Sequence, residues 1–85
     1  MSYQLEIKPS ARKELESLDD VTLRRVDKAI LKLAMNPRPH GATKLTGTPL
    51  YRIRVGTYRV VYEVDDSERR VTVNAVRHRR DVYRR

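Results

Sequence analysis

The second half of the chain is rich in arginine. From Tyr51 onward every basic residue is an arginine: Arg52, Arg54, Arg59, Arg69, Arg70, Arg77, Arg79, Arg80, Arg84 and Arg85. All the lysines lie earlier in the chain. A guanidinium group offers a planar fork of donors that holds phosphate oxygens in pairs, whereas an ammonium group is a point charge. The pattern predicts phosphate binding, and a solubilising surface with a coding bias towards arginine is the alternative interpretation.

The residues around Gly56-Thr57 predict that three of these arginines share one face of a sheet. A two-residue hairpin loop at this position places Arg54 opposite Arg59. Because side chains alternate along a strand, Arg52, Arg54 and Arg59 then lie on one face, which we call the arginine face, together with Glu63. The other face is apolar and is expected to meet the helices: Ile53, Val55, Tyr58, Val60 and Tyr62.

The crowding of the arginine face suggests a ligand. Like charges directly opposite each other across two strands destabilise a sheet by some tenths of a kcal/mol. In this sequence Glu63 is the acid expected near the three arginines; we interpret it as a salt-bridge partner, and a general base is the weaker alternative. An anion would complete such a site. A solvated outer face on which the arginines splay apart is the competing interpretation.

The C-terminal run Arg77–Arg85 supplies further candidates. Antiparallel pairing places its start beside Arg59, so Arg77 or Arg79 can join the arginine face and Tyr83 can lie over it. His78 is the conventional general base in this region, with a reference pKa of roughly 6.5. Its neighbouring position on a strand turns it away from Arg77 and Arg79. A disordered basic arm is the other interpretation of this run.

Other residues suggest no metal or cofactor chemistry. The chain has no cysteine, and its acids are scattered or paired at turns without a histidine cluster. His40 lies among prolines and a glycine and is interpreted as a loop residue without chemistry. We therefore expect no metal site, no cofactor and no disulfide.

The elements that must position these residues follow from periodicity. An alternating strand is predicted over Tyr3–Lys8, and Ser10 is the expected N-cap of a helix from Ala11 to about Leu18. Asp19 or Asp20 is expected to cap a second helix, from Val21 to about Met35. Residues Arg38–Pro49 are predicted to form a loop. Three strands follow: Leu50–Val55, Tyr58–Val64 and Val71–Val76.

The fold class predicted from this order is α+β. An N-terminal strand and a two-helix hairpin precede a three-stranded antiparallel meander, with the helices packed on one face of the sheet. The 85 residues have room for one domain, over residues 1–85. A net charge of +8 suggests a polyanionic partner. The N-terminus lacks the pattern of a signal peptide and no apolar stretch has the length of a membrane span, so we expect a cytoplasmic protein without membrane contact.

The sequence resembles a known family in three places. Tyr51–Tyr62, read as YRIRVGTYRVVY, resembles the core of the RelE branch of the RelE/ParE toxin superfamily. Lys44-Leu45-Thr46-Gly47 looks like the "KL.G" segment of that family, and His78–Tyr83 looks like its "HRr.vY" ending. With the order of the elements, the resemblance covers nearly the whole chain and implies a RelE-like microbial RNase-type fold.

The resemblance implies a function and roles for particular residues. RelE-type proteins are toxins of type II toxin–antitoxin pairs that enter the ribosomal A site and cut messenger RNA without a metal, which inhibits translation. Arg59 and Arg79 match family arginines, and we expect them to stabilise the transition state after attack by the RNA 2′-hydroxyl. Tyr83 matches a tyrosine that can stack on a base or transfer a proton. Arg77 competes with Arg79 for its role, and His78 is a further candidate for catalysis.

RNA-binding roles and partners come with the same resemblance. The residues expected to hold the RNA backbone are Arg52, Arg54, Lys44 and Arg80. Arg54 is also a candidate for the catalytic set. The implied partners are a cognate antitoxin encoded next to the toxin, the ribosome and its messenger RNA, with DNA contacted only through the toxin–antitoxin complex.

Two other functions remain open at this point. A ParE-like inhibitor of DNA gyrase shares the fold and has no nuclease activity, so the fold alone cannot decide. ParE-type chains generally lack the full arginine cluster. The second alternative is a non-enzymatic basic module that binds nucleic acid, although the five tyrosines and the absence of Phe and Trp leave few stacking platforms.

Overall fold

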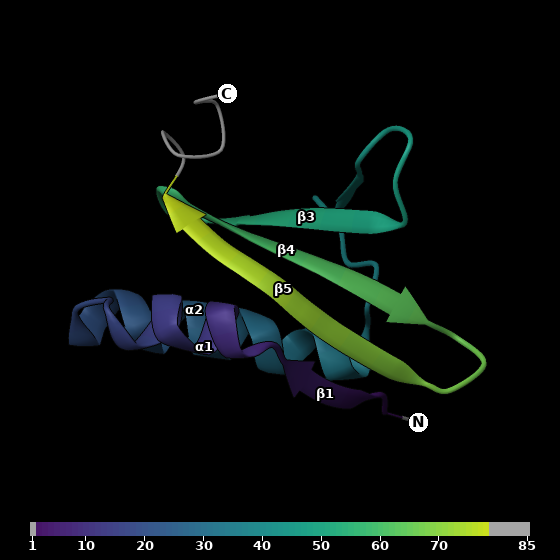
Figure 1. Cartoon of the computed structure of the whole chain (residues 1–85), viewed down its shortest axis with the longest axis horizontal. Coiled ribbons are helices and arrows are strands. Elements are labelled where there is room, and N and C mark those ends of the chain that lie inside the picture. Colours follow the sequence, from purple (N-terminus) through teal and green to yellow (C-terminus); the bar gives the residue numbers. More distant parts are fainter. Residues whose placement is uncertain (1, 79–85) are drawn as a thin grey trace.

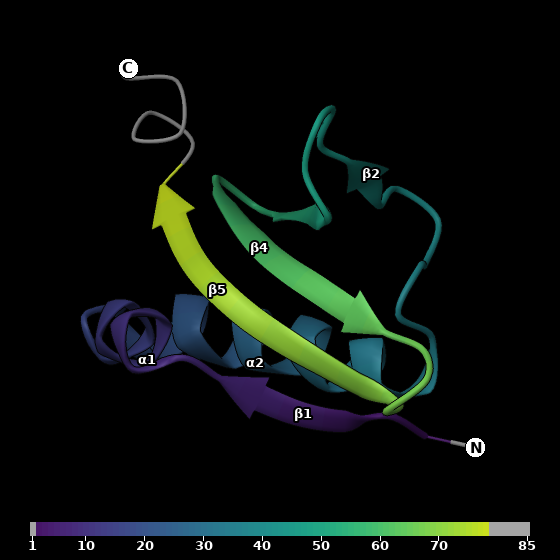
Figure 2. The same cartoon turned by 45° about the vertical axis from the view of Figure 1, so that its right-hand side comes forward.

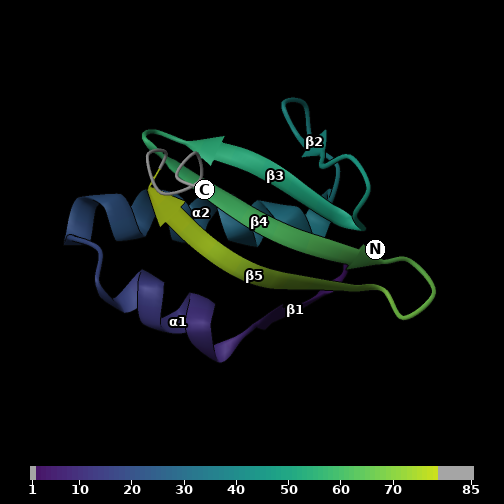
Figure 3. The same ribbon diagram turned by 45° about the horizontal axis from the view of Figure 1, so that its top comes forward.

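A computed structural model describes residues 2–78 of the chain. The elements follow in the order β1 (Gln4–Ile7), α1 (Pro9–Glu16), α2 (Asp20–Met35), β2 (Thr43–Lys44), β3 (Leu50–Val55), β4 (Tyr58–Asp65) and β5 (Arg70–His78). The strands form one mixed sheet, and both helices lie on the same side of it (Figures 1 and 3). The predicted α+β class is confirmed. Neither helix within residues 2–78 has the length and apolar character needed to cross a bilayer.

The five strands of the sheet lie in the order β1-β5-β4-β3-β2. β1 runs parallel to β5, while all the other neighbours are antiparallel. Strand β4 is therefore the middle strand of the sheet. The start of β4 lies beside the last residues of β3 and β5, next to the turn between β3 and β4 (Figure 2). The short strand β2 corrects the prediction of a continuous loop over Arg38–Pro49, because two residues are too few to show a period.

The helices begin and end close to the predicted positions. The expected Ser10 N-cap of α1 is wrong: Pro9 occupies the first turn and Lys8 is the N-cap, without a side-chain hydrogen bond. The fixed φ of proline suits this position, where a backbone N–H would lack a helical partner. In α2, Asp19 caps the helix by accepting a 3.3 Å hydrogen bond from the Thr22 N–H. Asn36-Pro37 follows its last residue, as predicted.

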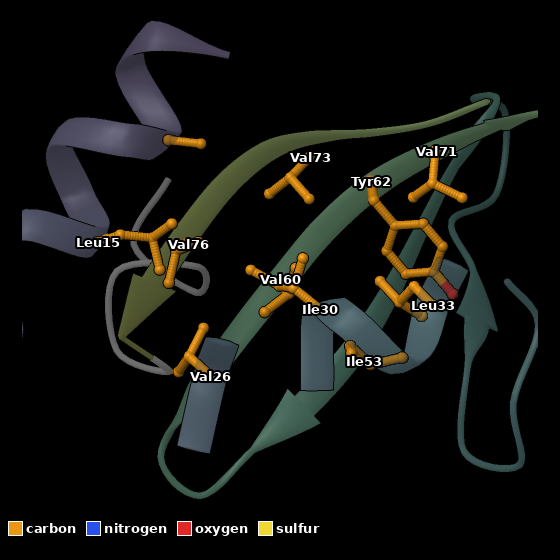
Figure 4. Packing of buried hydrophobic residues seen from close by; sticks show 11 residues of the cluster. Leu15, Val26, Ile30, Leu33, Ile53, Val60, Tyr62, Val71, Val73 and Val76 are labelled. Carbon is orange, nitrogen blue, oxygen red and sulfur yellow. The ribbon is translucent and has the colours of Figure 1, made fainter. Parts of the chain in front are cut away.

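The core lies between the two helices and the inner face of the sheet (Figure 4). Its buried members from the helices are Ala11, Leu15, Val26, Ile30 and Leu33, and those from the sheet are Ile53, Val60, Tyr62, Val71, Val73 and Val76. The apolar face predicted for the hairpin is thus the face that meets the helices. A slip of one residue in either strand would place arginines in this core, which explains why the register is well determined.

Candidate anion-binding site

The β3–β4 hairpin has the predicted register. Arg54 lies opposite Arg59, and Ile53 lies opposite Val60. The turn requires a positive φ at Gly56, where φ is 61°. Arg52 lies opposite Val61, so Arg52, Arg54 and Arg59 share the face of the sheet away from the helices. The arginine face predicted from the sequence is therefore present.

Strand β5 adds a third arginine to the same line. Arg77 lies opposite Arg59 on the other side of β4, and we call Arg54, Arg59 and Arg77 the arginine row. A bulge makes this possible. Val61 pairs with Ala75 but Tyr62 pairs with Val73, so Asn74 is an extra residue in β5. In a regular strand, residues four positions apart lie on the same face, so Arg77 would point into the core like Val73. The extra residue turns Arg77 to the outer face.

The arginines differ in exposure. Arg54 is exposed and Arg52 is half-buried, whereas Arg59, on the central strand, is 1% exposed. The periodicity of the sequence did not predict how deeply Arg59 is buried. Desolvating a cation costs free energy, so a guanidinium group at this depth needs polar or anionic partners that replace the lost water.

A carboxylate that sequence analysis missed contacts the arginine row. Glu14 Oε2 accepts a 2.5 Å hydrogen bond from Arg77 Nε, and Glu14 Oε1 accepts one of 2.8 Å from the Val76 backbone N–H. A signal was available in the sequence. Glu14 comes three residues after Ala11 and directly before Leu15, both buried, so it borders the stripe of α1 that packs on the sheet.

Glu63 does not have the role expected from the sequence. It lies on the outer face but pairs with Leu50 and Thr72, four residues along β4 from Arg59. At about 3.4 Å per residue, this spacing places it more than 10 Å from the arginine row. Within residues 2–78 Glu63 forms no ion pair, so the prediction of a salt-bridge partner is wrong.

A hollow of about 370 Å³ lies beside the arginine face. Arg52, Ile53 and Arg54 of β3 line one side, and the other side is lined by His40 and Gly41 before β2 and by Thr43, the first residue of β2. His40, which its neighbours in the sequence predict to be a loop residue without chemistry, lies next to two of the predicted RNA-binding residues, Arg52 and Arg54. The hollow gives an anion bound by Arg52 or Arg54 a second wall.

The remaining candidates are less closely grouped. Lys44 lies opposite Tyr51, which packs on the core, so its side chain leaves the sheet on the face away from Arg52 and Arg54. His78 lies opposite Tyr58, with the two rings edge to face and their centroids 5.2 Å apart. This contact lies on the helix side and agrees with the expectation that His78 turns away from the arginine row. Arg79, Arg80 and Tyr83 lie outside the described residues.

The site consists of guanidinium groups on adjacent strands of a sheet whose other face carries the core. Arginine stays protonated at ordinary pH, so these groups can orient an anion and stabilise negative charge, and they serve poorly as bases. Fold and site together define a small basic α+β domain with an anion-binding sheet face.

Residues 5–83 match the family described as the ParE toxin of type II toxin–antitoxin systems, parDE, and the chain belongs to this family. Toxin RelG of Mycobacterium tuberculosis is 35% identical over 89 residues, which cover 100% of both chains. Among solved structures, the archaeal RelE–RelB complex of Pyrococcus horikoshii contains a chain with a TM-score of 0.83 and 32% identity, covering 93% of this chain and 97% of that one. For the intact RelBE complex of Escherichia coli the TM-score is 0.78 and the identity 31%, covering 88% and 94%. The resemblance to the RelE branch is confirmed.

Proposed function

We propose that this toxin is a metal-independent endoribonuclease that cuts messenger RNA in the ribosomal A site and so inhibits translation. The observation that supports the proposal most is the arginine row, in which three strands bring guanidinium groups to one line on the outer face. The similarity to proteins named RelG and RelE supports the proposal too, because it places the chain in the RelE branch of the superfamily.

In the proposed reaction the RNA 2′-hydroxyl attacks the adjacent phosphorus and the 5′-oxygen leaves. The products are a 2′,3′-cyclic phosphate and a 5′-hydroxyl, so one proton leaves the 2′-oxygen and one reaches the leaving oxygen. Arg59 and Arg79 stabilise the charge that develops on the phosphate oxygens. Arg52 and Arg54, with a contribution from Arg80, hold the RNA backbone in line for attack. Tyr83 is proposed to stack on a base or transfer a proton.

The proposal includes an antitoxin. The relatives from Pyrococcus horikoshii and Escherichia coli are seen in complexes with RelB. We expect a cognate antitoxin encoded next to this chain, with an acidic or apolar segment that suits the arginine face. Contact with DNA would then occur through the toxin–antitoxin complex.

One other function has support from a particular finding. The matching family is described as ParE toxin, and a ParE-like chain would poison DNA gyrase without cutting RNA. The arginine row argues against this alternative, because a gyrase inhibitor has no need of converging phosphate-binding groups. DNA breaks without message cleavage after induction would favour it.

The test of the proposal is cleavage of ribosome-bound message by purified toxin and by Arg59→Met, which keeps much of the side-chain volume. We expect cleavage to fall by about 10²- to 10³-fold, as when one charge-stabilising group is removed from an active site, with much less loss of RNA binding. Arg69→Met is the matched control, because Arg69 lies over the Tyr3 ring at the far end of the sheet. Full cleavage by the Arg59 variant would remove this residue from the mechanism. Salt-dependent binding by the wild type without cleavage would favour a non-enzymatic module.

A further inference from the structure

The carboxylate of Glu14 joins helix α1 to the end of strand β5. Its two oxygens have different donors, the Val76 backbone N–H at 2.8 Å and Arg77 Nε at 2.5 Å. The Glu14 side chain is 28% exposed, so it is largely withdrawn from water. One side chain therefore fixes both the backbone of β5 and the neighbouring arginine.

The backbone contact exists because β1 is shorter than β5. Strand β1 pairs with β5 only from Gln4↔Arg70 to Ile7↔Val73, after which the chain turns into α1. Val76 lies past this pairing, on an edge without a neighbouring strand. A backbone N–H away from water needs an acceptor, and a carboxylate is a strong one. The Glu14 carboxylate thus accepts the backbone hydrogen bond that a neighbouring strand would accept at this position.

The contact between Glu14 and the Arg77 side chain places a negative charge beside the arginine row. Arg59 has a like-charged residue opposite it on each side, Arg54 on β3 and Arg77 on β5, and such pairs repel. Within residues 2–78 Glu14 is the carboxylate bound to this row. It binds Arg77 through Nε, and no other side-chain hydrogen bond of Arg77 occurs within residues 2–78. The two Nη groups keep their donors for an anion.

We infer that Glu14 is a positioning residue for RNA cleavage, a role that rests on the proposed function. It acts through Arg77. By holding Nε and the Val76 N–H together, it fixes the direction of the guanidinium and the end of β5 from which the rest of the chain continues. Glu14 itself does not bind the RNA phosphates, because its carboxylate carries the same sign of charge as they do.

The experiment is a double-mutant cycle on the cleavage of ribosome-bound message. Glu14→Gln keeps an amide oxygen that can accept from Val76 but removes the charge that holds Arg77. We expect kcat to fall by about tenfold with little change in KM, since misplacing a charged group affects the reacting geometry more than substrate affinity. Arg77→Ala should show a similar loss, and adding Glu14→Gln to it should cause no further loss. Glu16→Gln, an exposed acid on the same helix, is the control and should keep the wild-type kcat.

Two outcomes would overturn the inference. One is a wild-type kcat in Glu14→Gln, and the other is a double variant whose loss equals the product of the two single losses. A measurement on the unaltered protein guards against a variant that fails to fold: the Arg77 Nε–H should give a resolved, slowly exchanging NMR signal, and rapid exchange of this proton would also overturn it. If that signal is present but the wild type cuts no message, the proposed function and the positioning role fail while the Glu14–Arg77 contact stands.

Discussion

The two ends of the sheet treat arginine differently. At the end formed by the β4–β5 turn, Arg38 donates to both carboxylate oxygens of Asp66, at 2.8 and 3.3 Å, and to the Tyr51 hydroxyl at 3.0 Å. Arg70 lies within 4.0 Å of Glu6 and 3.9 Å of Glu68. Each of these arginines has carboxylate partners within the protein. We call this end the paired end.

At the opposite end the arginine row has far fewer anions. Within residues 2–78 only Glu14 contributes a carboxylate, and it contacts Arg77 at the margin of the row. Arg52 and Arg54 form no ion pair in this part of the chain. The arginines of the paired end thus contact acids within residues 2–78, whereas Arg52 and Arg54, which are proposed to bind RNA, form no ion pair there. The residues that contact an arginine therefore say more about the role of that arginine than its position in the sequence does.

The largest expected effect on stability comes from removing a buried hydroxyl group beside the paired end. Tyr62 is fully buried on the core side, its hydroxyl donates a 2.7 Å hydrogen bond to the Pro37 carbonyl, and burial raises its pKa to about 12. Tyr62→Phe leaves that carbonyl without its donor. The free energy of unfolding should fall by about 1–3 kcal/mol, the usual cost of an unsatisfied buried polar group. Urea denaturation measures this change.

Tyr51→Phe is the matched control for that variant. The two rings stack with centroids 5.7 Å apart, but the Tyr51 side chain is only half-buried and its hydroxyl accepts from Arg38, which can turn to water. We expect a clearly smaller loss of stability. Equal losses in the two variants would mean that burial of the hydroxyl is not what matters. Neither variant should change the salt dependence of RNA binding, because neither removes a charge.

Much of this comparison could be predicted from the sequence. The pairing of Arg54 with Arg59 follows from Gly56-Thr57 and the alternation of apolar residues, since both signals are local. The presence of Arg77 in the row was one of two open possibilities. Its placement depends on the bulge at Asn74. The apolar alternation runs on through Val71, Val73 and Ala75 and breaks only at Val76, so it does not show where the extra residue lies.

The contacts of the acids were harder to predict. Glu63 shares a face with the arginines, and that was the reason to expect a salt bridge, but sharing a face says nothing of the distance along the strand. Glu14 is 62 residues from Val76 in the chain, and the bond between them depends on how α1 packs against β5. Ion pairs between distant elements are set by tertiary packing, which local periodicity does not encode.

A smaller effect is expected from relieving repulsion at the arginine end. Arg54→Thr removes one member of a like-charged cross-strand pair and introduces a residue that favours strands, so stability should rise by some tenths of a kcal/mol. Arg52→Thr is the control, because Arg52 lies opposite Val61 and should gain less. Both variants should reduce the slope of log K against log salt for single-stranded RNA by about 0.7, the value for one phosphate contact. An unchanged slope in both would contradict backbone binding by these residues.

The smallest effect should come from titrating the paired end. The hydrogen bond from Arg38, followed by that from the Tyr3 hydroxyl, holds the pKa of Asp66 below its ordinary value of 3.8. A carboxyl group with a depressed pKa adds stability above its unfolded-state pKa, and this stability is lost as the pH falls through the folded-state value. Asp66→Asn should therefore lower the melting temperature near neutral pH by a small amount, since Asp66 is exposed and screened by solvent.

The sign of the pH dependence separates the Asp66 contribution from other causes of acid instability. Protonation of every carboxyl group raises the net positive charge, so wild type and variant both lose stability in acid. Asp19 and Asp65 also have lowered pKa values, from the hydrogen bonds of Thr22 in one case and of Glu68 in the other, and both remain in the variant. The difference in melting temperature between wild type and Asp66→Asn should thus shrink as the pH falls below about 4. A difference that stays constant with pH would mean that Arg38 gains nothing from the charge of Asp66, and the paired end would then be held by hydrogen bonds alone.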